Sequence, residues 1–204
     1  VFDFFNLTTG NNRLICLTDE GSYEWSEDLP AGSFASPAVS EELDLVVAGC
    51  EKLNGDSLYA FTLDGTSLWS ADVGPIGYAS PVIYDDTVYV VSKKTGQSPV
   101  TAFTQVVALD SSSGDIKWNT TIGDMVPELY SNAAYSSPAI AEGFLYVASP
   151  DGVLCKIDAS DGSVVKTNSI WVKGVSSTIV QSSPAYADGM IYIGSPNGYL
   201  YAFN

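Results

Sequence analysis

The sequence predicts an all-β protein, and more narrowly a β-propeller built from four-stranded antiparallel blades. Three observations lead to this prediction. A Ser-Pro dipeptide recurs at residues 36–37, 80–81, 137–138 and 183–184. Short runs rich in Val, Ile, Leu and Tyr follow each dipeptide, and turn signals such as Asp-Gly and Asn-Gly separate the runs. Because a single blade cannot bury both of its faces, such repetition is typical of stacked blades.

The first strand of each unit directly follows Ser-Pro, and the second is an alternating apolar run. The second runs are "DLVVAG" (44–49), "VYVVS" (88–92), "LYVAS" (145–149) and "IYIGS" (191–195). The middle of each run lies nine residues after the serine. We therefore expect a turn of constant length, without insertion, between the first two strands.

The third strand of each unit is a second apolar run, and the fourth follows a turn led by glycine. The third runs are "RLICLT" (13–18), "SLYAFT" (57–62), "VVALD" (106–110), "VLCKID" (153–158) and "YLYAFN" (199–204). Trp25, Trp69 and Trp118 each stand four residues after a turn glycine, and Lys166 takes the matching place in the next unit. Because the fourth strand is the outer one, we expect the indoles to pack between blades as structural residues.

These units divide the chain, treated as one domain over residues 1–204, into about four to five blades. Their approximate bounds are 1–32, 33–76, 77–133, 134–180 and 181–204. Residues 1–29 are typical of the end of a preceding blade, and residues 181–204 supply three strands only. Two arrangements follow: the chain is an arc of a larger propeller, or it closes a small ring in which a strand near Trp25 completes the sheet begun by residues 183–203.

The repeated pattern "SSPAIAEGFLYVAS", followed by Leu-Tyr-Ala and Gly-x-x-x-Trp, resembles the pyrroloquinoline-quinone (PQQ) repeat. That repeat is shared by quinoprotein dehydrogenases and by many propellers without the cofactor. The resemblance implies seven or eight blades in a whole propeller, and a tryptophan-docking role for the three aligned indoles. In the dehydrogenases it also implies adjacent cysteines in a disulfide, a tryptophan stacked on the quinone and a bound calcium.

No two cysteines are adjacent here, so we expect neither PQQ nor calcium as a cofactor. Cys16 and Cys155 fall on strands and are expected in the core, whereas Cys50 follows a strand at a loop and is expected to be exposed. With no histidine in the chain, His-dependent nucleophile systems and His-based zinc sites are excluded. An Asp that precedes Gly in a turn is explained by the turn itself and does not indicate a calcium ligand. We therefore predict no catalytic and no metal site.

The charge of the chain limits its partners and its location. With 8 Lys and Arg against a net charge of −16, the chain is not expected to bind nucleic acid. No apolar run is long enough to cross a bilayer. The sequons at Asn6 and Asn119, together with the low Lys and Arg content, favour an extracytoplasmic protein, secreted or at the cell surface.

The units differ in length at only two of their connections. Extra residues fall between the second and third strands, within "CEKLNGD" and "KKTGQSPVTAFTQ", and between the fourth strand and the next unit, near "DMVPELYSN" and "VKGVSSTIV". Because antiparallel strands alternate in direction, these connections emerge on one face, and the acidic turns lie on the other. We call these the long-loop face and the acidic-turn face.

A partial ring of aromatic residues is expected at the channel mouth on the long-loop face. Phe34, Tyr78, Tyr135 and Gln181 each lie two residues before a Ser-Pro serine, and Tyr130 lies in the longest insertion. The plain interpretation is that these rings only pack the channel mouth. Long loops on a rigid scaffold often bind partners, so the sharper hypothesis is that a protein, a glycan or a neighbouring domain docks here.

Three functions are consistent with these residues. The first is a non-catalytic binding or assembly module, in which a partner docks on the long-loop face. The second is a small-molecule or glycan binder at the channel mouth. The third is a fragment of a PQQ-dependent quinoprotein dehydrogenase. The fold alone does not choose among them, because one fold serves many functions.

Overall fold

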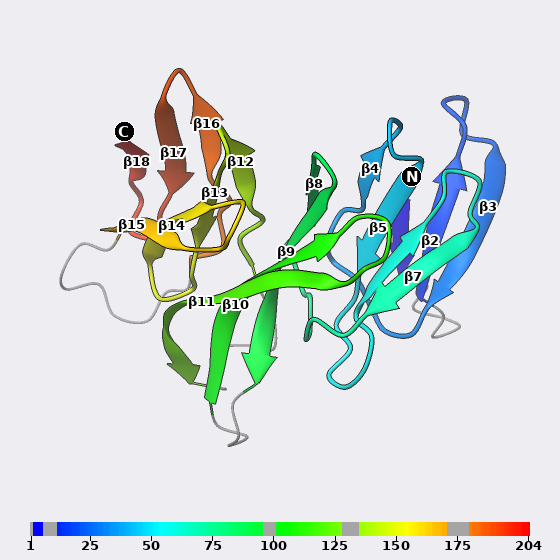
Figure 1. The fold of residues 1–204 in the computed structure, drawn as a ribbon, viewed down its shortest axis with the longest axis horizontal. Coiled ribbons are helices and arrows are strands. Elements are labelled where there is room, and N and C mark those ends of the chain that lie inside the picture. Colours follow the sequence, from blue (N-terminus) through cyan, green and yellow to red (C-terminus); the bar gives the residue numbers. More distant parts are fainter. Residues whose placement is uncertain (1, 6–11, 96–100, 128–134, 171–179) are drawn as a thin grey trace.

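The computed structural model describes residues 2–5, 12–95, 101–127, 135–170 and 180–204. Within these ranges the chain forms five antiparallel β-sheets and no helix, and the prediction of an all-β propeller fold is confirmed. In every sheet the strands pair in the order in which they occur in the chain. Figure 1 shows the sheets side by side along an arc, with the first and the fifth at its two ends.

The first and fifth sheets contain three strands each, and the three between them contain four. The first sheet holds β1 (Phe2–Phe5), β2 (Asn12–Leu17) and β3 (Tyr23–Leu29). The second holds β4 (Ala38–Ser40), β5 (Leu45–Gly49), β6 (Leu58–Phe61) and β7 (Ser67–Ala71). The third holds β8 (Val82–Tyr84), β9 (Thr87–Thr95), β10 (Thr101–Asp110) and β11 (Ile116–Pro127). The fourth holds β12 (Ala139–Ala141), β13 (Phe144–Ala148), β14 (Val153–Asp158) and β15 (Val164–Ser169), and the fifth β16 (Ala185–Ala187), β17 (Met190–Gly194) and β18 (Leu200–Phe203).

The closed ring considered above is not the arrangement observed. Strand β3, which carries Trp25, pairs with β2 in the first sheet. Strand β18 pairs with β17, and the fifth sheet lies at the opposite end of the arc (Figure 1). Of the two arrangements considered, the closed ring, in which a strand near Trp25 completes the sheet of residues 183–203, is therefore not seen, and the sheets form an arc.

The core lies between neighbouring sheets rather than at one centre. Four clusters of buried apolar side chains fill the four successive interfaces, for example Leu45, Val88 and Leu109 between the second and third sheets. All five residues of β5 are buried, because this strand is covered on both faces. Each sheet thus depends on its neighbours for burial, as the repeat predicted.

The turn between the first two strands is longer in the second sheet than in the others. Ala38 pairs with Val47, nine positions on, whereas Ala139 pairs with Tyr146, seven positions on. The expectation of a constant turn is therefore wrong at residues 41–44. Two extra residues in the turn leave each side chain of β5 on the same face of the sheet, so the alternation of apolar residues did not reveal the longer turn.

The insertion in the third unit is partly strand and not only loop. Ala102 pairs with Thr95 and Thr101 with Pro127, so the hairpins of β9, β10 and β11 extend well past the length of the equivalent strands in the second sheet. Figure 1 shows these long strands projecting from the arc. The connection between the second and third strands of this unit is therefore built partly as a β-hairpin.

Cys50 is buried, with no exposed surface, so the expectation that it is exposed is wrong. Its N–H donates to the carbonyl of Ser57 over 2.8 Å, and its carbonyl accepts from the N–H of Ile76 over 3.0 Å. The loop after β5 is thus covered by the connection that follows β7. Cys16, which was expected in the core, is only partly buried, whereas Cys155 is buried as expected. Burial raises the pKa of the Cys155 thiol to about 11. A thiol in that state is a poor nucleophile at neutral pH.

The Ser-Pro serines form a series of hydrogen bonds between the inner strands. The N–H of Ser36 donates to Oγ of Ser80 over 2.9 Å. The N–H of Ser80 donates to Oγ of Ser137 over 2.9 Å, and the N–H of Ser137 donates to Oγ of Ser183 over 3.0 Å. The hydroxyls of Ser80, Ser137 and Ser183 therefore each satisfy a main-chain donor of the preceding sheet, and these bonds fix the spacing of the sheets at their inner edge.

Replacing Ser137 with alanine is expected to lower the free energy of unfolding by about 1 kcal/mol, because the partly buried N–H of Ser80 loses its acceptor. Urea denaturation followed by circular dichroism measures the change. Ser36→Ala is the matched control, because the Ser36 hydroxyl has the same place in the motif but accepts no hydrogen bond from the described residues. Equal losses in the two variants would contradict a role for this bond.

Candidate functional site

Three aromatic rings stack in a row at the start of consecutive sheets, and we call them the aromatic stack. The ring centroids of Phe34 and Tyr78 are 4.9 Å apart with planes 19° apart. Those of Tyr78 and Tyr135 are 5.3 Å apart with planes 9° apart. Phe34 is 54% exposed and Tyr78 is 47% exposed, so the stacked rings form a contiguous aromatic surface that is open to solvent.

The aromatic stack follows from the serine hydrogen bonds. Each ring is two residues before a Ser-Pro serine, so the bonds that hold consecutive serines at one spacing also hold the rings. Gln181 stands at the next position of the series, before Ser183, and its side chain is exposed. The series of stacked rings ends at Tyr135 for this reason. Tyr130, the other predicted member, lies outside the described residues.

The long connections gather on one side of the second and third sheets. Residues 53–55, from the connection between β5 and β6, and residues 72–75, from the connection between β7 and β8, line one hollow of about 550 Å³. Asn119 lines it too. The short turns gather elsewhere, where Asp44, Asp86 and Asp110 line a second hollow of about 530 Å³. The two kinds of connection thus separate as the strand directions require.

The connection that leads to Tyr78 is fixed from several sides. Nε2 of Gln105 donates to the carbonyl of Val73 over 2.8 Å and to Oγ of Ser92 over 3.1 Å, and all three residues are buried. Oγ of Ser57 donates to the carbonyl of Gly74 over 2.7 Å. Sequence reasoning missed these polar residues, because a Gln or Ser inside a strand carries no signal of what it bonds. They fix the backbone of Val73 and Gly74, which precede Tyr78 in the same connection.

The carboxylates of the acidic turns are used to cap those turns. Oγ of Ser112 donates to Oδ1 of Asp110 over 2.6 Å, and the N–H of the same serine donates over 3.0 Å. These bonds lower the pKa of Asp110 to about 2, with a further contribution from Lys117. Bonds from Thr62 and Thr66 lower the pKa of Asp64 likewise. In the part of the chain that the structure describes, no group of three or more Cys, Asp or Glu side chains is placed to hold a metal ion.

Each of the three aligned tryptophans reaches the following sheet, and we call this arrangement the tryptophan contact. The indole Nε1 of Trp25 donates to the carbonyl of Leu63, that of Trp69 to Ser111 and that of Trp118 to Ala159, over 2.8, 2.8 and 3.1 Å. Each ring also lies against a turn glycine of the next sheet. Adding a Cβ to Gly65, Gly114 or Gly162 brings it within 2.8, 2.6 and 2.6 Å of the ring. The indoles are half-buried and engaged in blade packing.

The two predicted glycosylation positions differ in what the structure describes. Asn119 is exposed on β11, the outer strand of the third sheet. Asn6 lies outside the described residues. Within the described part of the chain there is no helix long and apolar enough to span a membrane.

The repeated sheets, the Ser-Pro series and the tryptophan contacts define a PQQ-repeat β-propeller protein. The family model described as outer membrane protein assembly factor BamB matches residues 3–122 and 54–204. The chain belongs to this family. A search of curated proteins found no match.

Solved structures with the same fold include BamB from Moraxella catarrhalis, with 19% identity and a TM-score of 0.67. That match covers 90% of this chain and 50% of BamB, so the chain spans about half the length of that protein. The computationally designed Ika4 protein has 15% identity and a TM-score of 0.60, over 87% and 93% of the two chains. The quinohemoprotein alcohol dehydrogenase of Comamonas testosteroni has 13% identity and a TM-score of 0.62, over 96% and 40%.

Proposed function

We propose that the chain is a non-catalytic β-propeller module that binds a protein partner on its long-loop face, with Phe34, Tyr78 and Tyr135 as the central contacts. The observation that carries this proposal is the aromatic stack, an ordered apolar surface on a rigid support. Membership of a family described by an assembly factor supports a binding role. Aromatic anchors are also the residues that dominate the energy of protein interfaces.

The geometry of the stack favours a protein over a glycan. Sugars bind by lying flat on an aromatic face, but both faces of Tyr78 are covered by its neighbours. The exposed parts of that ring are its edge and its hydroxyl. Ring edges and phenol hydroxyls suit apolar side chains and main-chain carbonyls of a protein. A glycan or small molecule at the channel mouth therefore remains the less favoured function.

No observation beyond the shared fold favours the dehydrogenase alternative. The likeness to the quinohemoprotein enzyme, at 13% identity, supports a shared fold and nothing more. The chain has no adjacent cysteines, and Cys155 is held as a buried thiol with a raised pKa. The proposed module therefore acts by binding, without PQQ, calcium or another cofactor.

The proposed location is extracytoplasmic, at the cell envelope or outside it. The family description supports this, because it names an outer membrane protein assembly factor. The exposed sequon at Asn119 is consistent with a glycosylated protein if the source cell modifies such sites. Fractionation of the native cell, with glycosidase treatment of the recovered protein, tests location and modification together. Recovery of unmodified protein from the cytosol would contradict the proposed location.

The variant Tyr78→Ala combined with Tyr135→Ala is expected to weaken partner binding at least tenfold, because two apolar contacts of about 1 kcal/mol or more are removed. The partner is first captured by a photoreactive amino acid placed at residue 78, and its affinity is then measured by calorimetry. The matched control places the photoreactive group at Ser112 on the acidic-turn face, where no adduct is expected. If the double variant binds as wild type while Asp64→Asn abolishes binding, the partner uses the acidic-turn face instead.

A further inference from the structure

Two Asn-Gly sequences occur in the chain, and the structure places them in different settings. They are Asn54-Gly55, in the connection between β5 and β6, and Asn197-Gly198, in the turn between β17 and β18. An asparagine that precedes glycine is prone to deamidation, because glycine has no side chain to hinder attack of its nitrogen on the asparagine amide. In a folded protein the reaction also requires that the two residues can move.

Three hydrogen bonds restrain Asn197 and Gly198. Nδ2 of Asn197 donates to the hydroxyl of Tyr201 over 2.7 Å, and its Oδ1 accepts from the N–H of Tyr199 over 3.1 Å. The N–H of Gly198 donates to the carbonyl of Ser195 over 3.0 Å. Closure of a ring between this nitrogen and the side chain of Asn197 has to break these bonds. The turn therefore protects this asparagine.

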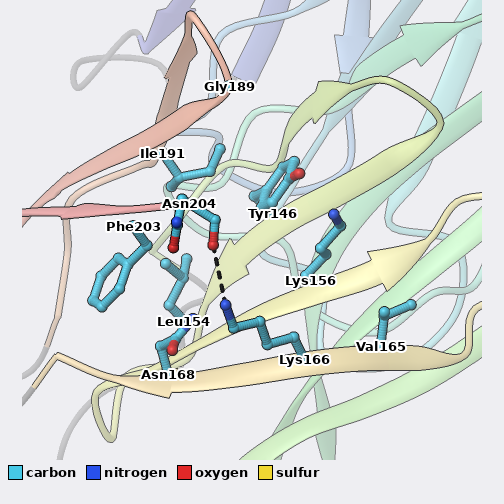
Figure 2. A pocket seen from close by; sticks show the side chains of 10 residues that line it. All are labelled: Tyr146, Leu154, Lys156, Val165, Lys166, Asn168, Gly189, Ile191, Phe203 and Asn204. Atoms are coloured by element: carbon cyan, nitrogen blue, oxygen red, sulfur yellow. Dashed lines mark hydrogen bonds between the residues drawn. The ribbon is translucent and has the colours of Figure 1, made fainter.

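The asparagines of paired strands are restrained as well. Asn168 pairs with Leu154, and Figure 2 shows it on the same strand as Lys166. Asn119 on β11 pairs with Val107. A strand that is paired in a sheet opens only rarely, so the rotation that ring closure requires is opposed at both positions.

Asn54 and Gly55 have no such restraint among the residues that the structure describes. Both are exposed, and residues 53–55 form a bend outside the strands. Within the described ranges, neither the side chain of Asn54 nor the N–H of Gly55 makes a hydrogen bond. This Asn-Gly pair is therefore the one that can reach the reactive geometry without loss of structure.

A cation lies beside Gly55. Nζ of Lys52 is 3.4 Å from the position that a Cβ on Gly55 would occupy. A nearby positive charge favours loss of the proton from the peptide nitrogen, the step that makes this nitrogen a nucleophile. The carboxylate of Asp56, which has the opposite effect, accepts a hydrogen bond from Oγ of Ser70 on β7 over 2.5 Å. We therefore expect the ammonium to assist the reaction.

We infer that Asn54 is a site of spontaneous deamidation in the folded protein. The nitrogen of Gly55 attacks Cγ of Asn54 and closes a succinimide ring. The bond from Cγ to Nδ2 breaks, and Nδ2 leaves as ammonia with the proton that Gly55 loses. Water then opens the ring to aspartate or isoaspartate, and no oxidant or reductant is needed.

The reaction changes the hollow of about 550 Å³ beside the long connections, which Asn54 lines together with Asp72 and Lys93. A neutral amide there becomes a carboxylate, and isoaspartate adds a carbon to the main chain. The charge and the shape of this hollow therefore change as the protein ages. Because the reaction consumes only water, it is independent of the proposed partner.

The test is incubation of the full folded chain in buffer, with deamidation at each asparagine followed over time by peptide mapping and mass spectrometry. The rate at residue 54 is expected to be at least about tenfold higher than at residue 197, where three hydrogen bonds must break. In urea, which removes the fold, the two rates are expected to become similar. Equal rates in the folded chain, or no reaction at residue 54, would overturn the inference.

Lys52→Met is expected to slow deamidation of Asn54 severalfold, because the ammonium beside Gly55 is removed. Lys117→Met is the matched control, since it removes the same charge from β11, where the ammonium pairs with Asp110. The control is expected to react at the wild-type rate, and circular dichroism confirms that both variants are folded. Equal slowing in the two variants, or none in either, would contradict the role of Lys52.

Discussion

Trp118→Ala is expected to lower the free energy of unfolding by about 3 to 5 kcal/mol, the usual cost of removing a large aromatic side chain from a packed site. The change removes the indole from the groove between the third and fourth sheets. It also removes one of the two donors to the carbonyl of Ala159, and the hydroxyl of Tyr89 remains as the other. The ring of Tyr89, with its centroid 5.9 Å from that of Trp118, loses a neighbour as well.

Chemical denaturation followed by circular dichroism measures this loss. Tyr23→Ala is a suitable control. Tyr23 lies on β3, the strand that also carries Trp25, but its side chain is 65% exposed. A change of less than about 1 kcal/mol is expected for it, as is usual for surface positions. A loss in Trp118→Ala no larger than in the control would mean that the tryptophan contact does not stabilise the protein.

Gly162→Ala is expected to lower the free energy of unfolding by about 2 to 4 kcal/mol, for two reasons that add. The backbone of Gly162 has φ of +77°, a conformation that costs an L-residue energy. A Cβ at this position would also lie 2.6 Å from the indole of Trp118, so the ring or the turn must move. Thermal or urea denaturation gives the change.

The chain provides a matched control for the backbone part of this effect. Gly143 also has φ of +77°, but a Cβ there meets nothing within 4 Å. Gly143→Ala should therefore show the strain alone, about 1 to 2 kcal/mol. In the background of Trp118→Ala, the loss caused by Gly162→Ala should become smaller but stay above that of Gly143→Ala, because Oγ1 of Thr120 still lies 2.8 Å from the added Cβ. Additive losses in the double variant would contradict the steric explanation.

Much of the fold could be predicted from residue patterns, because strands and turns leave local signals. Apolar alternation identified the second and third strands, and the glycine before each tryptophan identified the turn into the fourth. Turn lengths and contacts between sheets could not be predicted in the same way. The four-residue turn at residues 41–44 preserved the facing of β5, so no pattern exposed it. Cys50 was expected to be exposed because it follows a strand, but the connection after β7 covers it.

The candidate site, like the fold, could be predicted only in part. The positions of Phe34, Tyr78 and Tyr135 were evident from their constant distance to Ser-Pro. Their stacking depends on the spacing of neighbouring inner strands, which the serine hydroxyls set through bonds between sheets. A sequence shows which residues repeat, whereas the atoms that meet between repeats depend on the assembled structure.

The tryptophan contacts all have one direction, since each indole reaches the sheet that comes next in the chain. During synthesis from the N-terminus, each indole must therefore wait for the following repeat to leave the ribosome before it finds its acceptor. Co-translational folding of such a chain lags one repeat behind elongation. Unravelling that begins at the first sheet breaks the contact of Trp25 at once, whereas loss of the fifth sheet breaks none of the three contacts, because Lys166 stands where the fourth sheet would carry a tryptophan.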